Sequence, residues 1–147
     1  MRALRVILLT ALVAGCHFDK LFNSSGGGAA SRGGGGPPAA THLIFLTQPS
    51  DAAPGAPIAP PVRVAAEDDQ DRVVTTFSGT ISIAIGHNGS LLGNAQLSGT
   101  KDVAAVNGIA TFTDLSIDQP GISDYTLVAS SDPLVRTESA PFKVTGP

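Results

Sequence analysis

Apolar and polar residues alternate with a period of two through most of the chain after residue 41. The alternation is clearest in residues 77–86, where Ile81, Ile83 and Ile85 occupy every second position. Alternate side chains of a strand point to the same face of a sheet, so this pattern predicts strands with one buried face. Further strands are expected within residues 41–50, 62–68, 95–117, 124–130 and 139–145, with Pro49 ending the first. We therefore predict an all-β antiparallel domain.

Each predicted strand offers one apolar face to a core. In the second strand Arg63 and Glu67 are expected on the outer face, because they alternate with apolar residues. The expected inward residues are Val62, Val64, Ala66, Ile81, Ile83, Ile85, Ala110, Phe112, Leu115, Ile117, Tyr125, Leu127, Ala129, Phe142 and Val144.

Turn-forming residues separate these strands. Asn107-Gly108 is a favoured two-residue hairpin turn, since both residues tolerate positive φ. The tripeptide at residues 87–89 is expected to turn the chain, and Gly99 to bend it. Residues 53–61 are too rich in proline for an inner strand, so they should run along an edge.

The residues before this domain are of a different kind. Residues 1–15 combine two arginines, an apolar stretch and small residues, which is the composition of an export signal. As a helix, residues 3–15 reach only ~20 Å, against ~30 Å for a bilayer core. Residues 23–40 hold nothing apolar larger than alanine or proline, so they are expected to form a disordered Gly-rich tether. The predicted organisation is a signal helix in residues 1–15, an N-terminal tether in 16–40 and one domain in 41–147.

The leader ends in Val13-Ala14-Gly15-Cys16, which resembles the lipobox of bacterial lipoproteins. The resemblance implies cleavage between Gly15 and Cys16 and a covalent diacylglyceryl group on the Cys16 sulfur. A thiolate is the nucleophile that such a modification needs. His17 follows the cysteine where an inner-membrane lipoprotein tends to have Asp, so the resemblance implies a lipid-anchored protein of the bacterial cell envelope, in the outer membrane. The alternatives are an ordinary signal peptide with an incidental cysteine, and an uncleaved leader whose cysteine is buried.

The domain resembles the bacterial immunoglobulin-like domains of surface and secreted proteins. The resemblance covers residues 41–145 and is most specific in residues 97–131. It implies an immunoglobulin-like antiparallel β-sandwich of about seven strands. Tyr125, which follows Gly121, is expected to act as a tyrosine corner, with its hydroxyl bonded to backbone upstream. The chain departs from the family in two ways. It carries Asp-Gln-Asp-Arg at residues 69–72, where an Asp-x-x-Gly-Asn turn is common. It also contains one copy of the domain, whereas the family's domains usually occur in tandem arrays.

Net charge and cysteine content limit which partners and which stabilising bonds are expected. A formal charge of −3 offers no basic surface for nucleic acid. The single cysteine allows no internal disulfide, so packing alone must stabilise the domain.

One acidic turn is the best metal candidate. Glu67, Asp68, Asp69 and Asp71 could supply oxygen ligands to Ca²⁺, although they lack the spacing of a calcium loop. A solvated turn without an ion is the more common outcome, and Asp114 and Asp118 could join only if folding brings them close. No other cofactor is expected.

The chain is expected not to be an enzyme. Its three histidines are scattered, and no Gly-x-Ser-x-Gly elbow is present. The expected role is interaction with an envelope protein or a glycan, as in cell adhesion. Such binding would use loops grouped at one end of the domain, in residues 68–72, 86–94 and 119–124. A purely structural spacer and a small periplasmic hydrolase are the alternatives.

Overall fold

The computed structural model describes residue 36 and residues 38–146. The leader, Cys16 and the first part of the tether lie outside these residues. The described part is all-β and forms no helix, so none of its segments could cross a membrane as a helix. Nine short strands make three antiparallel sheets.

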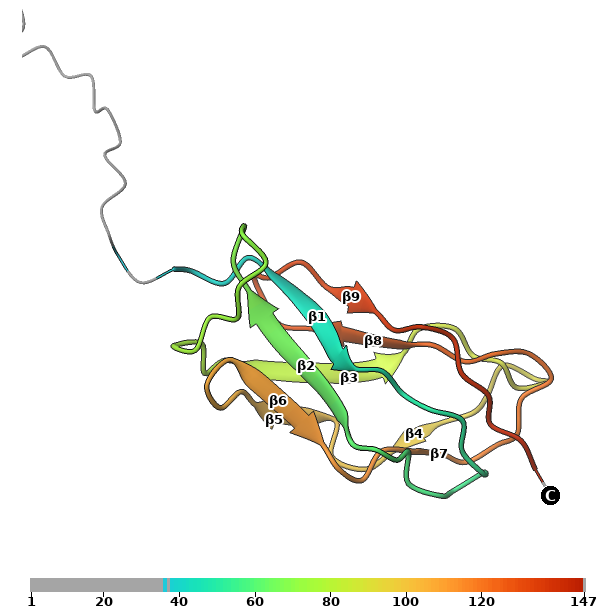
Figure 1. Ribbon diagram of the computed structural model, residues 1–147. Helices are drawn as coiled ribbons and strands as arrows, with labels where there is room; N and C mark the ends of the chain where they lie inside the picture. Colours follow the sequence, from blue (N-terminus) through green and yellow to red (C-terminus); the bar gives the residue numbers. More distant parts are fainter. Residues whose placement is uncertain (1–35, 37, 147) are drawn as a thin grey trace, which may run out of the picture. The chain divides into compact units, whose positions relative to one another are not determined.

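The first sheet has the order β1–β2–β6 and is built from β1 (His42–Thr47), β2 (Val62–Glu67) and β6 (Ile109–Phe112). The strands β1 and β2 pair from His42 opposite Glu67 to Thr47 opposite Arg63, with a register shift between Phe45 and Thr47. This antiparallel pairing brings the end of β2 back to the start of β1. The turn after Glu67 therefore lies where the chain enters the domain (Figure 1).

The second sheet has the order β5–β3–β8–β9. It consists of β3 (Thr80–Ile85), β5 (Asp102–Ala104), β8 (Leu127–Ser130) and β9 (Thr137–Glu138). A third, two-stranded sheet pairs β4 (Leu97–Ser98) with β7 (Ser116–Ile117). The strands number nine because the segment from 95 to 117 breaks into short pieces at the Gly99 bend and the Asn107-Gly108 turn.

Side chains from both larger sheets meet in one hydrophobic cluster. Every predicted inward residue is buried there except Ile85, which is half-buried against the cluster. The period-two prediction of the core faces is therefore confirmed. The cluster also holds Leu43, Phe45, Ile58, Ala95 and Ala105, which the alternation did not single out.

Asn107 and Gly108 form a two-residue turn between Val106 and Ile109. The backbone groups of Val106 and Ile109 bond to each other, with N···O distances of 2.9 and 3.1 Å. Asn107 has a φ of 51° and Gly108 a φ of 79°, as a type I′ turn requires. The turn carries the chain from β5 in the second sheet to β6 in the first.

The Pro-rich segment forms no named strand and follows the edge next to β7. The amide of Gly55 donates to the carbonyl of Ile117 at 2.7 Å, and that of Ile58 to Leu115 at 2.8 Å. The Ile58 side chain is 2% exposed, so this segment also closes one side of the core.

The single strand expected at residues 139–145 is wrong in detail. This segment makes only two isolated bridges, between Phe142 and Tyr125 and between Val144 and Ala52. Pro141 has no amide hydrogen to donate, so a continuous ladder is interrupted there.

Candidate functional site

The acidic turn after β2 does not gather its four acids. Both carboxylate oxygens of Asp68 are already bonded: Oδ1 accepts from the amides of Gln70 and Arg72, and Oδ2 accepts from the Arg72 guanidinium at 2.9 Å. The hydrogen bond from the Arg72 side chain is the largest cause that lowers the pKa of Asp68. Asp68 is thus the structural centre of the turn, and Asp69 points into solvent.

Glu67 differs from its predicted position on a solvated face, because it is only 6% exposed. The chain folds back after the turn, and Val73 forms an antiparallel bridge with Glu67, so Glu67 has a paired backbone neighbour on both sides, His42 on one and Val73 on the other. The structure brings Glu67 and Asp71 together with His42, whereas Asp68 and Asp69 are outside this group.

Asp114 and Asp118 have other partners. Asp114 accepts hydrogen bonds from the amide and the hydroxyl of Thr100, each at 2.9 Å. The bond from the Thr100 amide is the first of the causes that lower the pKa of Asp114. Asp118 accepts from the amide of Gln96 at 2.7 Å. Each of these acids joins a segment next to β4 to a segment next to β7, and neither belongs to the group around Glu67.

Tyr125 lies at the centre of the loops that precede β8. Its hydroxyl donates to the backbone carbonyl of Gln119 at 3.0 Å, and its ring lies 6.2 Å from that of Phe142, measured between ring centroids. Burial raises the pKa of the Tyr125 hydroxyl. A Cβ atom on Gly121 would lie 2.7 Å from a Tyr125 ring carbon, so only glycine leaves room for the ring here.

The three loops expected to share one end do not do so. Residues 86–94 and 119–124 lie together at the end opposite to the one where residues 38–41 enter, whereas residues 68–72 lie at the entrance end (Figure 1). We call residues 86–94 and 119–124 the distal loops. They are tied by a bridge between Ser90 and Gly121 and by a bond from the Ile122 amide to the Gly89 carbonyl at 2.9 Å.

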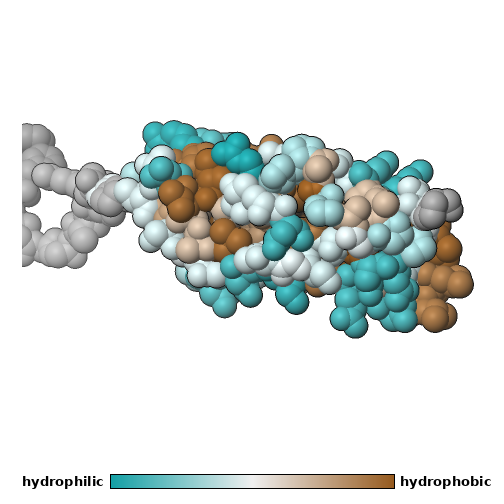
Figure 2. All heavy atoms as spheres, turned by 90° about the horizontal axis from the view of Figure 1, so that it is seen from below, coloured by the Kyte–Doolittle hydropathy of each residue, from teal (hydrophilic) through white to brown (hydrophobic). Residues whose placement is uncertain are grey.

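The distal loops expose large apolar side chains. Leu91, Leu92 and Ile122 are 72%, 79% and 73% exposed. Figure 2 shows hydrophobic atoms gathered at this end of the domain, next to a strongly hydrophilic area. The composition of these loops suggested no such patch, because it is dominated by Gly, Ser, Asn and Asp.

A hydroxyl and an imidazole approach each other in the same loops. The Ser123 hydroxyl lies 3.5 Å from Nε2 of His87, at the outer limit of a hydrogen bond. Among the described residues, no carboxylate is bonded to the other ring nitrogen of His87. The pair therefore lacks the third group that orients the base in a hydrolytic triad.

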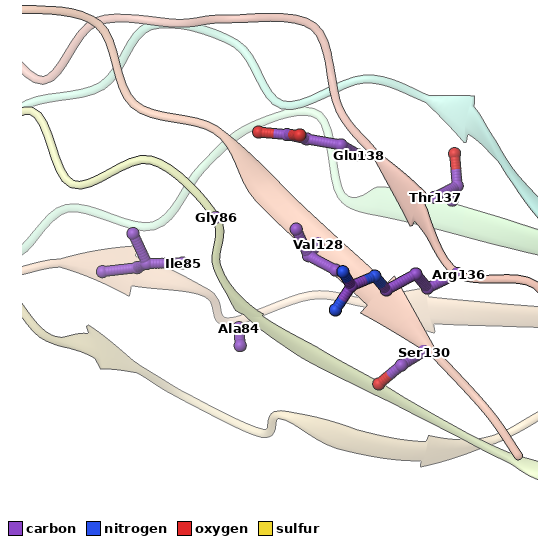
Figure 3. Close-up of a pocket in the computed structure, with 8 residues that line it drawn as sticks. All are labelled: Ala84, Ile85, Gly86, Val128, Ser130, Arg136, Thr137 and Glu138. Atoms are coloured by element: carbon purple, nitrogen blue, oxygen red, sulfur yellow. The ribbon is translucent and has the colours of Figure 1, made fainter.

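A hollow of about 630 Å³ lies over the outer face of the second sheet. Small outward residues of β3 and β8, such as Ala84 and Ser130, form its floor, and Arg136 and Glu138 lie beside it (Figure 3). The Glu138 carboxylate accepts from the Thr126 hydroxyl and points away from Arg136. The hollow gathers no pair of groups that could exchange a proton with a substrate.

No protein-family model matches the chain, and no curated protein sequence matches it.

Proposed function

We propose that the chain is a non-catalytic lipoprotein of a bacterial cell envelope. It is anchored by lipid on Cys16, in the outer membrane, and displays an immunoglobulin-like β-sandwich that binds a protein through its distal loops. We infer the lipid anchor from the leader sequence. We infer that the partner is a protein from the exposed apolar side chains of the distal loops.

The arrangement of the strands supports an immunoglobulin-like sandwich. Two antiparallel sheets share one core, and the bond from Tyr125 to the Gln119 carbonyl has the form of a tyrosine corner. The chain also changes its partner between residues 42 and 52: β1 pairs with β2, whereas Ala52 forms a parallel bridge with Val144. This bridge ties the segment that follows β1 to the segment that follows β9.

The patch at Leu91, Leu92 and Ile122 is the observation that carries the binding role. Single exposed apolar residues are ordinary on a protein surface, but three on two tied loops give a group that water solvates poorly. All three are aliphatic and carry no hydrogen-bonding group, so they suit the apolar side chains of a protein better than the hydroxyls of a glycan.

A structural spacer without partners would have no use for this patch, which is why we prefer the binding role. The His87 and Ser123 contact is the only feature that favours the hydrolase among the described residues, and it lacks an orienting carboxylate. Turnover of ester or peptide substrates that Ser123→Ala abolishes would overturn the non-catalytic proposal.

The binding role can be tested by placing a photo-crosslinking amino acid at position 92 of the full chain, in the cells that produce it. A single heavier adduct is expected, and Ile122→Ser should remove it. The matched control carries the crosslinker at Val106, which is also strongly exposed, at 71% against 79% for Leu92, but lies beside the Asn107-Gly108 turn.

The partner found in the adduct must then bind the purified chain, with at least about tenfold loss of affinity in the Leu91→Ser and Ile122→Ser variants. Equal crosslinking at positions 92 and 106 would contradict the proposal. An adduct of twice the chain's own mass would replace a foreign partner by a second copy, and would contradict it as well.

A further inference from the structure

Three potential metal ligands of different kinds meet where the chain enters the domain. His42 begins β1, Glu67 ends β2 directly opposite it, and Asp71 lies in the turn that follows. Nε2 of His42 is 3.6 Å from Oε2 of Glu67 and 3.7 Å from Oδ1 of Asp71. One ligand atom from each residue lies within 4.8 Å of the other two.

The turn is shaped so that Asp71 returns toward β1. Asp71 has a φ of 56°, which is unusual for a residue other than glycine, and its amide donates to the carbonyl of Asp68 at 3.1 Å. The bonds between Asp68 and Arg72 hold this conformation. The Asp71 side chain is 89% exposed, so it can rotate toward a bound ion.

The imidazole of His42 is oriented by its other nitrogen. Nδ1 lies 3.1 Å from the Thr41 hydroxyl oxygen, and that hydroxyl lies 3.4 Å from the Glu67 carbonyl. If the hydroxyl gives its one hydrogen to the carbonyl, Nδ1 must be the donor to Thr41. The lone pair of a neutral His42 is then on Nε2 and faces the two carboxylates. Histidine ligands of metals commonly have their second nitrogen fixed in this way.

Glu67 provides the second, independent indication of a ligand. Its side chain is only 8% exposed, and among the described residues no hydrogen-bond donor reaches its carboxylate. The imidazole of His42 faces it at 3.6 Å, too long for a hydrogen bond, and carries a positive charge only when it is protonated. The Glu67 carboxylate oxygens still touch solvent, because no fully buried side-chain oxygen of the described residues lacks a hydrogen-bond partner. A carboxylate so largely withdrawn from water is stabilised by a cation that reaches it from outside.

The ligand atoms indicate which cation fits. One imidazole nitrogen and two carboxylate oxygens suit Zn²⁺ and similar first-row dications, whereas Ca²⁺ takes oxygen ligands and usually six to eight of them. With bonds of about 2.0–2.1 Å, two ligand atoms on a tetrahedral Zn²⁺ lie about 3.4 Å apart. The separations of 3.6 and 3.7 Å at His42 are close to this value.

We propose that His42, Glu67 and Asp71 bind a Zn²⁺ ion, with water completing its coordination. A hollow of about 360 Å³ opens on the other side of the turn; its lining includes Thr41, Gln70 and Arg72, which are neighbours of the ligands in the chain, but none of the three ligands. The ion joins the first strand to the turn after the second, and so fastens the domain at its entrance end. This site needs neither the lipid anchor nor the patch on the distal loops.

The test uses the full chain after treatment with a chelator, carrying Cys16→Ser and His17→Gln in every sample so that these N-terminal donors do not bind metal. Calorimetric titration with ZnCl₂ should show one ion per chain, and the unfolding temperature should rise with Zn²⁺ concentration. Titration with CaCl₂ should show at least about tenfold weaker binding.

Variants assign the ligands. His42→Gln, Glu67→Gln and Asp71→Asn are each expected to weaken Zn²⁺ binding at least about tenfold, and Thr41→Val to weaken it by about 10–100-fold through loss of the bond to Nδ1. The matched controls, His87→Gln and Asp69→Asn, should bind Zn²⁺ as the parent does. Circular dichroism of the metal-free proteins shows whether each variant folds.

Three results would overturn the proposal. One is the absence of saturable Zn²⁺ binding to the folded parent. Another is a loss of affinity in His87→Gln as large as that in His42→Gln. The third is binding of Ca²⁺ in preference to Zn²⁺, abolished by Asp69→Asn, which would return the site to the acidic turn alone.

Discussion

The hydroxyl of Tyr125 donates a hydrogen bond to the backbone carbonyl of Gln119, 3.0 Å away and six residues earlier in the chain. The same tyrosine pairs its backbone with Phe142 and packs its ring against it. One residue, just before β8, therefore joins a distal loop to the C-terminal segment.

Removal of this hydroxyl should destabilise the domain without disturbing its packing. Tyr125→Phe is expected to lower the free energy of unfolding by about 1 kcal/mol, because the Gln119 carbonyl loses its partner. Urea unfolding measures the change. Gln119→Ala is the control, since only the backbone of Gln119 takes part in the bond. Equal stability of Tyr125→Phe and the wild type would show that the bond adds nothing.

The two-residue turn at Gly108 should reject any side chain. Gly108→Ala is expected to cost about 1–3 kcal/mol, because φ is 79° and a Cβ atom would collide with the carbonyl oxygen of Val74. Gly55→Ala is the matched control: its φ is 72°, but a Cβ atom there meets nothing within 4 Å. The difference between the two unfolding free energies isolates the collision. Equal losses would mean that backbone conformation alone matters.

Acid should weaken the domain through Asp68 and Asp114. Hydrogen bonds lower the pKa of both carboxyls in the folded chain, so the unfolded chain binds their protons more tightly. The stabilisation is therefore present above about pH 4 and is lost as the pH falls through the folded values. Urea unfolding at several pH values should show the Asp68→Asn, Asp114→Asn double variant less stable than the wild type at pH 7. The gap should narrow as the pH falls below about 4, and a constant gap would contradict this explanation.

Cys16→Ser tests the anchor. The variant should leave the membrane fraction, because its hydroxyl cannot form the thioether that would hold the lipid. The wild type should gain the mass of acyl groups and lose residues 1–15, as intact-mass measurement would show. A variant that stays in the membrane, together with a wild type without acyl groups, would rule out the lipoprotein.

The sequence predicted what depends on neighbours in the chain. Period-two alternation was enough to assign the inward residues of β2, β3 and β8, and Asn-Gly carries its own preference for positive φ. These features are local, because strand geometry alone decides which face a residue occupies.

Burial of Ile58 was not predictable in this way, since it depends on where residues 53–61 pack against β7. The group of His42, Glu67 and Asp71 was missed for the same reason. This group forms only because β1 pairs with β2 in this register and because Asp71 has a positive φ. Neither feature can be inferred from the spacing of the three residues in the sequence. The antiparallel pairing of the first two strands does imply that residues 68–72 return to the entrance end, so their separation from the distal loops could have been inferred.

The position of the exposed loops at the end opposite the entrance has a mechanical consequence. Suppose that a partner bound at Leu92 pulls on the domain while an anchor on the N-terminal side of residue 38 holds it. The force then runs along β1 and β2, roughly parallel to the long axis of the domain (Figure 1). The backbone hydrogen bonds that join β1 (His42–Thr47) to β2 are then loaded in shear, so they share the load and must break together. A domain attached in this way would resist tension far better than one peeled open strand by strand.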